Sequence, residues 1–432
     1  MIKMIIYLIA LAVFLTQCFI MLFVYFNQRK PYKRALMNAY QSHTPVDEFF
    51  YFILIPCLNE EKVIQNTLNN VLKLPGQKQI IVIDDDSIDD TLIKVHQVDG
   101  PISIVERKLP NARTGKGDSL NYAMPTIQTF IRQHNLDPKN CIVGVIDADG
   151  VLSNNSILKL NDAFSNERND AVQLRVKMKS PLKVLQTFQD IEFFTINHLT
   201  QLFRANLNAV ALCGNGQFFR YSSITKKLGT TPWGNALLED YELTLRMELK
   251  GLHIAYIADA YVDQEALRNV KKLVIQRARW SQGGFNCWKY MKQIIQSKKM
   301  SLSQKFDSYF FFFQPVLNLL ADFSIIYLTI RFVFKHINNP EFLFVVLIAL
   351  AIIGLFFGII FTIIYMQELK LSDRAKLIIN RGDIFNIKFH VHNILFSIGL
   401  ISYIYIVLFF SLIIAIYHLI SHQTTWNKTQ RI

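Results

Sequence analysis

The pattern of hydrophobic and polar positions divides the chain into an apolar beginning, a mixed middle and an apolar end. Residues 4–26 carry no charge, and three further apolar stretches lie at 309–334, 342–366 and 396–420. A transmembrane helix needs about 20 apolar residues, so each stretch is long enough to cross a bilayer. We therefore expect an N-terminal transmembrane helix within 1–28, a C-terminal membrane region at 301–420 with an interfacial helix and about three spans, and a tail at 421–432.

The middle of the chain, 49–296, has the pattern of a folded α/β domain. Short apolar runs at 50–56, 79–84 and 141–147 predict buried strands, each followed by polar turn residues. Helix-like stretches follow the runs, most clearly at 60–74. This order predicts a mostly parallel sheet with helices on both faces, which binds ligands at the carboxyl ends of its strands.

Composition and charge support a membrane protein with a water-facing part. The chain has 432 residues, of which 51% are hydrophobic and 18% charged, whereas soluble domains average roughly 25% charged. The net charge of +13 fits basic loops on the cytoplasmic side, phosphate chemistry, or both. The basic residues after the first span place the middle domain in the cytoplasm and the protein in the plasma membrane. No nucleic-acid-binding motif is present, so we expect no nucleic-acid partner.

Two acidic clusters follow predicted strands. Asp84, Asp85 and Asp86 end the second strand, where carboxylates can accept hydrogen bonds from a base or ribose. Helix capping explains the later acids of this run but not these three together. Asp147 and Asp149 follow the third strand and, in an extended backbone, would point to one side. A pair of this kind suits Mg²⁺ or Mn²⁺ on a diphosphate, although turns also produce it.

Three further segments carry candidate chemistry. Glu239 and Asp240 open a predicted helix, as general-base candidates or as acids favoured by the helix dipole. The run from Gln276 to Trp280 joins an amide, two guanidinium groups and an indole, which suits phosphate and sugar binding but also a basic juxtamembrane helix. Lys116 lies between glycines without the spacing of a P-loop.

Taken in order, these motifs resemble the membrane-embedded family 2 glycosyltransferases, the group of cellulose, hyaluronan and poly-N-acetylglucosamine synthases. The resemblance covers about residues 50–290 and rests on the motifs Pro-Cys-Leu-Asn-Glu at 56–60, Asp-Asp at 84–85, Gly-Lys at 115–116, Asp-Ala-Asp at 147–149, Gly-Asn-Gly at 214–216, Glu-Asp at 239–240 and Gln-Arg-Ala-Arg-Trp at 276–280. It implies a GT-A type fold and a nucleotide-sugar donor.

The resemblance also implies roles for single residues. In the family pattern, Asp240 is the catalytic base, and Trp280 with Glu239 lies at the acceptor. Asp149 ligates Mg²⁺ or Mn²⁺. The donor is held by the remaining residues of the pattern: Asp84, Asp85, Lys116, Asp147, Gln276 and Arg279. The chain departs from the pattern at Asp86, where Gly is usual, and at Leu238, where Thr is common.

The expected activity is inverting transfer of a sugar, from UDP-N-acetylglucosamine or UDP-glucose, to a growing β-linked polysaccharide that is extruded across the membrane. Expected partners are the donor, a polysaccharide or lipid-linked acceptor, membrane lipid and accessory export subunits. One alternative is a single transfer to a lipid acceptor. The other is a transport or scaffold subunit with an inactive transferase domain.

Overall fold

The structure is a computed structural model that describes residues 18–28, 44–179, 183–374 and 399–421, with a few single positions before residue 18. Several predictions lie wholly or mostly outside the described residues. They concern the first part of the N-terminal span, the basic residues at 29–34, the basic loop before the last span, and the tail after 421.

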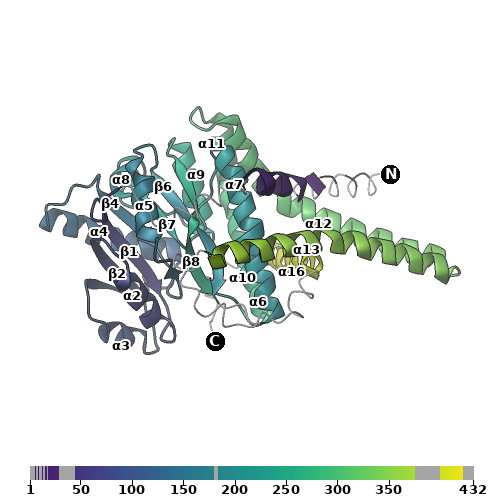
Figure 1. Ribbon diagram of the computed structural model, residues 1–432, viewed down its shortest axis with the longest axis horizontal. Coiled ribbons are helices and arrows are strands. Elements are labelled where there is room, and N and C mark those ends of the chain that lie inside the picture. The colour runs from purple at the N-terminus through teal and green to yellow at the C-terminus, as the bar shows by residue number, and fades with distance from the viewer. Residues whose placement is uncertain are drawn as a thin grey trace.

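Figure 1 shows a sheet at the centre of the described middle region. It has eight strands, in the order β3-β2-β1-β4-β7-β6-β8-β5. Pairings β1–β2, β1–β4, β2–β3 and β6–β8 are parallel, and β4–β7, β6–β7 and β5–β8 are antiparallel. The strands are β1 Phe50–Cys57, β2 Lys78–Asp85, β3 Ile102–Arg107, β4 Cys141–Val145, β5 Val151–Leu152, β6 Ala171–Lys179, β7 Gln217–Arg220 and β8 Ile254–Glu265. The predicted α/β fold with a mostly parallel sheet is confirmed.

Helices cover both faces of the sheet because alternate strand residues point to opposite sides. In β1, Tyr51, Ile53 and Ile55 belong to one hydrophobic cluster, together with residues of α2 (Ile64–Lys73) and α5 (Ser156–Ser165). Phe52 and Leu54 belong to another cluster, with residues of α4 (Lys116–Gln133) and α8 (Tyr221–Leu228). All five side chains are fully or almost fully buried, as expected for a continuous apolar run in a doubly covered parallel sheet.

Helices separate most of the strands along the chain, and more helices follow the last strand. They are α2 Ile64–Lys73, α3 Thr91–His96, α4 Lys116–Gln133, α5 Ser156–Ser165, α6 Val184–Asp190, α7 His198–Asn206, α8 Tyr221–Leu228, α9 Glu239–Leu249, α10 Val270–Asn286 and α11 Met291–Gln296. A π-helical segment η1, Ile191–Asn197, joins α6 to α7, and a 3₁₀ turn η2, Cys287–Tyr290, precedes α11. The helix predicted at 60–74 begins at Ile64, because Glu60 and its neighbours form the turn that enters it.

The C-terminal region contains α12 Leu302–His336, α13 Pro340–Arg374 and α16 Leu400–Ile420. Figure 1 shows α12 and α13 extending together away from the sheet. Within the described residues, α12 and α16 are long and apolar enough to cross a membrane. Shorter apolar helical segments occupy parts of the other two predicted spans, at Cys18–Gln28, Pro340–Ala349 and Leu355–Leu369. A total of four spans stays a prediction, and so do the domain boundaries.

A further hydrophobic cluster ties the apolar N-terminal and C-terminal helices to the sheet region. It joins Tyr25 of the N-terminal helix and Phe194 of η1 to Tyr365 of α13 and Tyr403 of α16. These residues are at most 9% exposed. The C-terminal helices α13 and α16 therefore pack directly on η1 and α10.

Candidate functional site

One cavity of about 240 Å³ collects nine of the ten predicted site residues. Its walls come from the ends of β1, β2 and β8, the loop after β4, the beginnings of α4 and α9, and one face of α10. The nine are Asp85, Lys116, Asp147, Asp149, Glu239, Asp240, Gln276, Arg279 and Trp280. They lie up to 195 positions apart in sequence. Asp85 ends β2, and Asp147 and Asp149 follow β4, at one edge of the sheet, and helices α4, α9 and α10 bring the others to that edge.

Asp84 is the predicted site residue that does not line the cavity. Its side chain is fully buried, and its Oδ2 accepts a hydrogen bond from the Ser87 backbone N–H at 3.2 Å. This contact supports the turn after β2. The sequence reasoning for Asp84 treated adjacent carboxylates alike, whereas successive residues of a strand point to opposite faces.

Asp85 lines the cavity beside a buried arginine. Its Oδ1 accepts a hydrogen bond at 2.7 Å from Arg107, the residue opposite it in the β2–β3 register. Its Oδ2 is buried and has no hydrogen-bond partner among the described residues. Burial raises the pKa of Asp85, and a hydrogen bond from the Arg113 backbone and the Arg107 charge partly oppose this. Asp85 therefore places a carboxylate at the cavity wall with one oxygen held by Arg107.

Asp147 and Asp149 lie in a turn rather than in the extended backbone that the sequence predicted. Strand β4 ends at Val145, and the Gly150 N–H donates to the Asp147 carbonyl at 2.7 Å. The two carboxylates have different partners: Oδ1 of Asp147 accepts from Lys116 at 2.6 Å, and Oδ2 of Asp149 accepts from the Glu265 backbone at 2.9 Å. Both side chains still line the cavity, so the turn places them at different points of the cavity wall.

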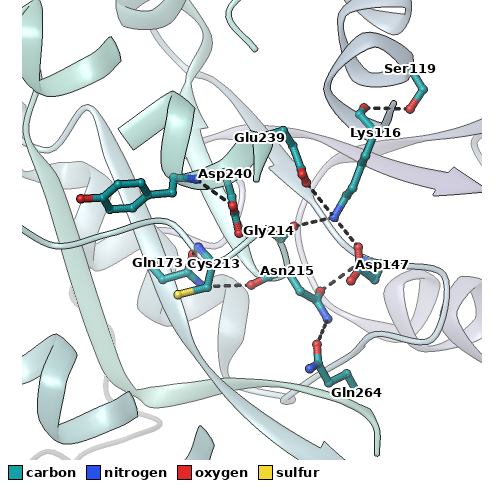
Figure 2. A network of polar contacts seen from close by, with 11 residues as sticks. Lys116, Ser119, Asp147, Gln173, Cys213, Gly214, Asn215, Glu239, Asp240 and Gln264 are labelled. Atoms are coloured by element: carbon teal, nitrogen blue, oxygen red, sulfur yellow. Dashed lines mark hydrogen bonds and ion pairs between the residues drawn. The ribbon is translucent and has the colours of Figure 1, made fainter. Parts of the chain in front are cut away.

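Lys116 connects the two acidic sides of the site, as Figure 2 shows. Its Nζ lies 2.6 Å from Asp147 and 3.5 Å from Glu239, and it donates to the Gly214 carbonyl at 3.2 Å. Burial alone lowers the pKa of Lys116, but the carboxylates of Asp147, Glu239 and Asp240 together raise it above its usual value. The ammonium group therefore stays charged and holds the carboxylates close together.

Asp240 stands at the beginning of α9, facing Gly214. A β-carbon on Gly214 would lie 3.0 Å from Oδ2 of Asp240, and Gly214 has φ +73°, so glycine gives this carboxylate its space. Burial, followed by the charge of Glu239, raises the pKa of Asp240 to about 7, although Lys116 opposes the shift. A carboxylate with a pKa near neutrality suits general-base catalysis.

Helix α10 presents one face to the cavity. Its residues Lys272, Gln276, Arg279 and Trp280 line the wall at the three- and four-residue spacing that places side chains on one side of a helix. Nε of Arg279 is buried and has no hydrogen-bond partner among the described residues. Burial lowers the pKa of Arg279, although Glu239, Asp147 and Asp240 oppose the shift. Because arginine binds phosphate through its guanidinium, this face of α10 is a candidate anion site.

Comparison with known proteins identifies the family. A family model described as "Glycosyltransferase like family 2" matches residues 49–283, more than half of the chain. The chain belongs to this glycosyltransferase family. The match covers the described sheet and every predicted site residue.

Individual relatives of this family 2 glycosyltransferase differ in their acceptors. The chain is 26% identical over 270 residues to a beta-monoglucosyldiacylglycerol synthase of Nostoc sp. (61% of this chain, 54% of the relative). It is 25% identical over 288 residues to a poly-beta-1,6-N-acetyl-D-glucosamine synthase of Staphylococcus epidermidis (65% of each). It is 31% identical over 271 residues to the probable glycosyltransferase YdaM of Bacillus subtilis (60% and 61%). The chain thus spans between half and two thirds of the length of these curated relatives.

A solved structure supports the fold. The mannosyltransferase PcManGT from Pyrobaculum calidifontis, in complex with GDP-Man and Mn²⁺, matches with a TM-score of 0.55 at 14% identity, covering 86% of this chain and 98% of that one. The likeness confirms the predicted GT-A type fold.

The cavity fits a divalent cation that is shared with a bound diphosphate. The described residues include no group of three or more histidine, cysteine or acidic side chains that could hold a metal by themselves. Asp149, beside Asp147, offers hard oxygen ligands on the cavity wall. Mg²⁺ and Mn²⁺ commonly take one or two carboxylates plus phosphate oxygens. Of the two, Asp147 pairs with Lys116 and Asp149 accepts a hydrogen bond from the Glu265 backbone.

Sequence reasoning missed several residues around the cavity. Phe193 lines it, with its ring edge-on to Trp280 at a centroid distance of 6.1 Å. Arg107 pairs with Asp85, and a register argument from the end of β3 could have found it. Nothing in the sequence marks Phe193, because its direction depends on the π-helical geometry of η1.

Proposed function

We propose that this protein is a membrane-bound inverting glycosyltransferase that transfers a sugar from a nucleotide sugar to a hydroxyl of a growing β-linked polysaccharide. The observation that carries the proposal is the single cavity in which a carboxylate of near-neutral pKa, Asp240, faces the Asp147–Asp149 turn and the anion-binding face of α10. Family membership and the resemblance to a poly-N-acetylglucosamine synthase support the donor and the reaction class.

The donor occupies the side of the cavity formed by the strand ends. Asp85, which lines this side, accepts hydrogen bonds from the base or ribose. Gln276 and Arg279 hold the diphosphate, and Lys116 and Asp147 lie between it and the acceptor side. Asp84 acts through the turn after β2 rather than by touching the donor.

A divalent cation, Mg²⁺ or Mn²⁺, would be held by Asp149 together with the diphosphate oxygens. When bound, it stabilises the negative charge that develops on the leaving nucleoside diphosphate. The mannosyltransferase of similar fold was solved with Mn²⁺ and GDP-Man, which supports this assignment.

Asp240 removes the proton from the acceptor hydroxyl as that oxygen attacks the anomeric carbon. The bond to the diphosphate breaks on the opposite side, so an α-linked donor gives a β-linked product. The acceptor sugar rests against Trp280, with Glu239 beside it. Glu239 also helps to hold Lys116, with 3.5 Å between Oε1 and Nζ, and so keeps the acceptor side near the donor.

A second candidate function is a single transfer to a lipid acceptor such as diacylglycerol. The observation that favours it is the similarity to the monoglucosyldiacylglycerol synthase of Nostoc sp.. In both cases we place the protein in the plasma membrane with the catalytic domain in the cytoplasm. Accessory export subunits belong to the polysaccharide proposal only.

The test uses membranes that contain the full chain, with Mn²⁺ or Mg²⁺ and radiolabelled UDP-N-acetylglucosamine or UDP-glucose. A long polymer, absent with Asp240→Asn, is the expected product. A short lipid-soluble product that also needs Asp240 would replace the polysaccharide proposal with the lipid candidate. No incorporation from either donor, with the protein folded, would refute the proposed donor class.

A further inference from the structure

Strand β6 places two cationic side chains, Arg175 and Lys177, in the interior on one face of the sheet. Both are at most 1% exposed. The Arg175 guanidinium lies 3.8 Å from the centroid of the Phe194 ring, and the Lys177 ammonium lies 3.1 Å from that of Tyr261. A buried charge is costly unless an opposite charge and hydrogen bonds compensate it.

The compensating acid comes from the helix that follows the first C-terminal span. Glu368 of α13 accepts hydrogen bonds from both terminal nitrogens of Arg175 at 3.2 Å, and it is itself 4% exposed. Three residues earlier on α13, the Tyr365 hydroxyl donates to Oδ2 of Asp190 at 2.6 Å. Helix α13 is therefore attached to the catalytic region at two buried polar points.

Both points attach to the π-helical segment η1. Asp190 immediately precedes η1, and its Oδ1 accepts a hydrogen bond from the Met178 backbone at 2.9 Å. Arg175 donates through Nε to the carbonyl of Phe194 at 3.1 Å. The Tyr365 ring also meets that of Phe194 edge-on, at 5.9 Å. A π-helix is an uncommon geometry found mostly at functional sites, and here its beginning and middle are held from α13.

The opposite side of η1 faces the acceptor end of the cavity. Glu192 pairs with Arg277 at 2.8 Å, and the Arg277 guanidinium lies 4.1 Å from the centroid of the Trp280 ring. Phe193 lines the cavity beside Trp280. Successive residues of one segment thus contact α13 (Phe194) and line the cavity (Phe193), and Glu192 reaches Trp280 through Arg277.

We propose that Glu368 and Tyr365 of α13 are positioning residues for acceptor binding, which act through η1 on Phe193 and Trp280. The proposal rests on the proposed function for its acceptor readout. It assigns α13 a role in shaping the catalytic cavity as well as in the membrane region. Neither residue lines the cavity, so the effect passes through Arg175, Asp190 and the turn of η1.

The test compares Glu368→Gln with wild type in the purified full chain, using UDP-N-acetylglucosamine as donor and a β-linked N-acetylglucosamine pentasaccharide as acceptor. If the product assay shows lipid transfer, diacylglycerol is the acceptor instead. We expect the acceptor KM to rise by about tenfold, within the range of coupling through packed elements, and the donor KM to change less than about twofold. Equal changes in both constants, or no change in either, would overturn the proposal.

Tyr365→Phe keeps the ring and removes only the hydrogen bond to Asp190, so it serves if Glu368→Gln fails to fold. It should shift the acceptor KM in the same direction by a smaller factor. The matched control is Asp259→Asn, which breaks the Lys159–Asp259 pair between α5 and β8, also at 3.2 Å and largely buried. Neither residue of that pair lines the cavity, so the ratio of the two KM values should stay as in wild type. An equal shift of this ratio in Asp259→Asn would show that Glu368→Gln acts only by general destabilisation.

A second readout does not depend on catalysis. Hydrogen exchange of the backbone amides at 190–197 should become faster in Glu368→Gln and stay unchanged in Asp259→Asn. If wild type transfers no sugar, the proposed function fails, and this exchange measurement alone decides the coupling. Unchanged exchange at 190–197 in Glu368→Gln would refute the link from α13 to η1 whatever the activity.

Discussion

Nζ of Lys116 lies 2.6 Å from Oδ1 of Asp147, an ion pair between the beginning of α4 and the turn after β4. Lys116 also lies 3.5 Å from Glu239, so one cation joins the carboxylates on the proposed donor side to those on the proposed acceptor side. Without it, three acidic side chains would lie close together in a largely buried cavity. Like charges at short range repel strongly when water is scarce.

Lys116→Met should therefore lower kcat/KM by about 10²–10³, the range seen when one preorganised electrostatic group is lost from an active site. Steady-state kinetics with the proposed donor checks this. Lys62→Met removes an exposed lysine that does not line the cavity and should leave the kinetics unchanged. Wild-type kinetics in the Lys116 variant would show that the ion pair has no part in the reaction.

The pH dependence of transfer should follow Asp240. Its pKa of about 7 means that the carboxylate is protonated below neutrality and cannot accept the acceptor proton. We expect kcat/KM to rise between about pH 6 and pH 8 and then to level off. A pH–rate profile checks this, and a profile that is flat across this range would contradict Asp240 as the base.

The same pKa predicts the sign of a stability change. Native Asp240 keeps its proton up to about pH 7, whereas the unfolded chain releases it near the ordinary value of 3.8. Between these pH values the native state binds more protons than the unfolded state. The contribution of Asp240 to the free energy of unfolding therefore falls as pH rises. Asp240→Asn should thus raise the midpoint of thermal unfolding, relative to wild type, more at pH 8 than at pH 5. Melting curves at both pH values test this, and a larger gain at pH 5 would reverse the assignment.

We expect sugar transfer to require a divalent cation and this requirement to depend on Asp149. A chelator such as EDTA should abolish transfer, and added Mn²⁺ or Mg²⁺ should restore it. Asp149→Asn should need about 10- to 100-fold more metal, the cost typical of a weakened metal site. Titration of Mn²⁺ against activity and against UDP binding measures this shift. An unchanged metal requirement in Asp149→Asn would move the cation to other ligands.

Two glycines with positive φ allow the cost of backbone strain to be compared with the cost of a steric collision. Gly216 has φ +70°, and a β-carbon there would lie 2.6 Å from Cγ1 of Val262; Gly229 has φ +81° with no atom within 4 Å. Gly229→Ala should cost about 1 kcal/mol from strain alone. Gly216→Ala should cost more, by about 1–3 kcal/mol, because an overpacked core must shift. Chemical denaturation measures both changes in the free energy of unfolding. Equal losses of stability would show that the Val262 side chain moves aside at little cost.

Much of the fold could be predicted because its signals are local. The apolar runs at 50–56 and 79–84 match β1 and β2 closely, since a strand buried on both faces needs uninterrupted apolar side chains. The carboxylates at the strand ends could be predicted to share a site for a related reason, because parallel strands end at one edge. Asp85, Asp147 and Asp149 line the cavity as that argument predicts, and the family resemblance supplied the six cavity residues that lie on helices.

The sequence by itself therefore determined the α/β order, the apolar segments and the chemical groups of the site. Only the tertiary structure decided which of Asp84 and Asp85 reaches the cavity, since a strand turns adjacent side chains to opposite faces. It also decided that Arg175 meets Glu368 across 193 positions, and that η1 directs Phe193 toward Trp280. Contacts of this kind depend on how distant elements pack, and residue spacing along the chain contains no signal for them.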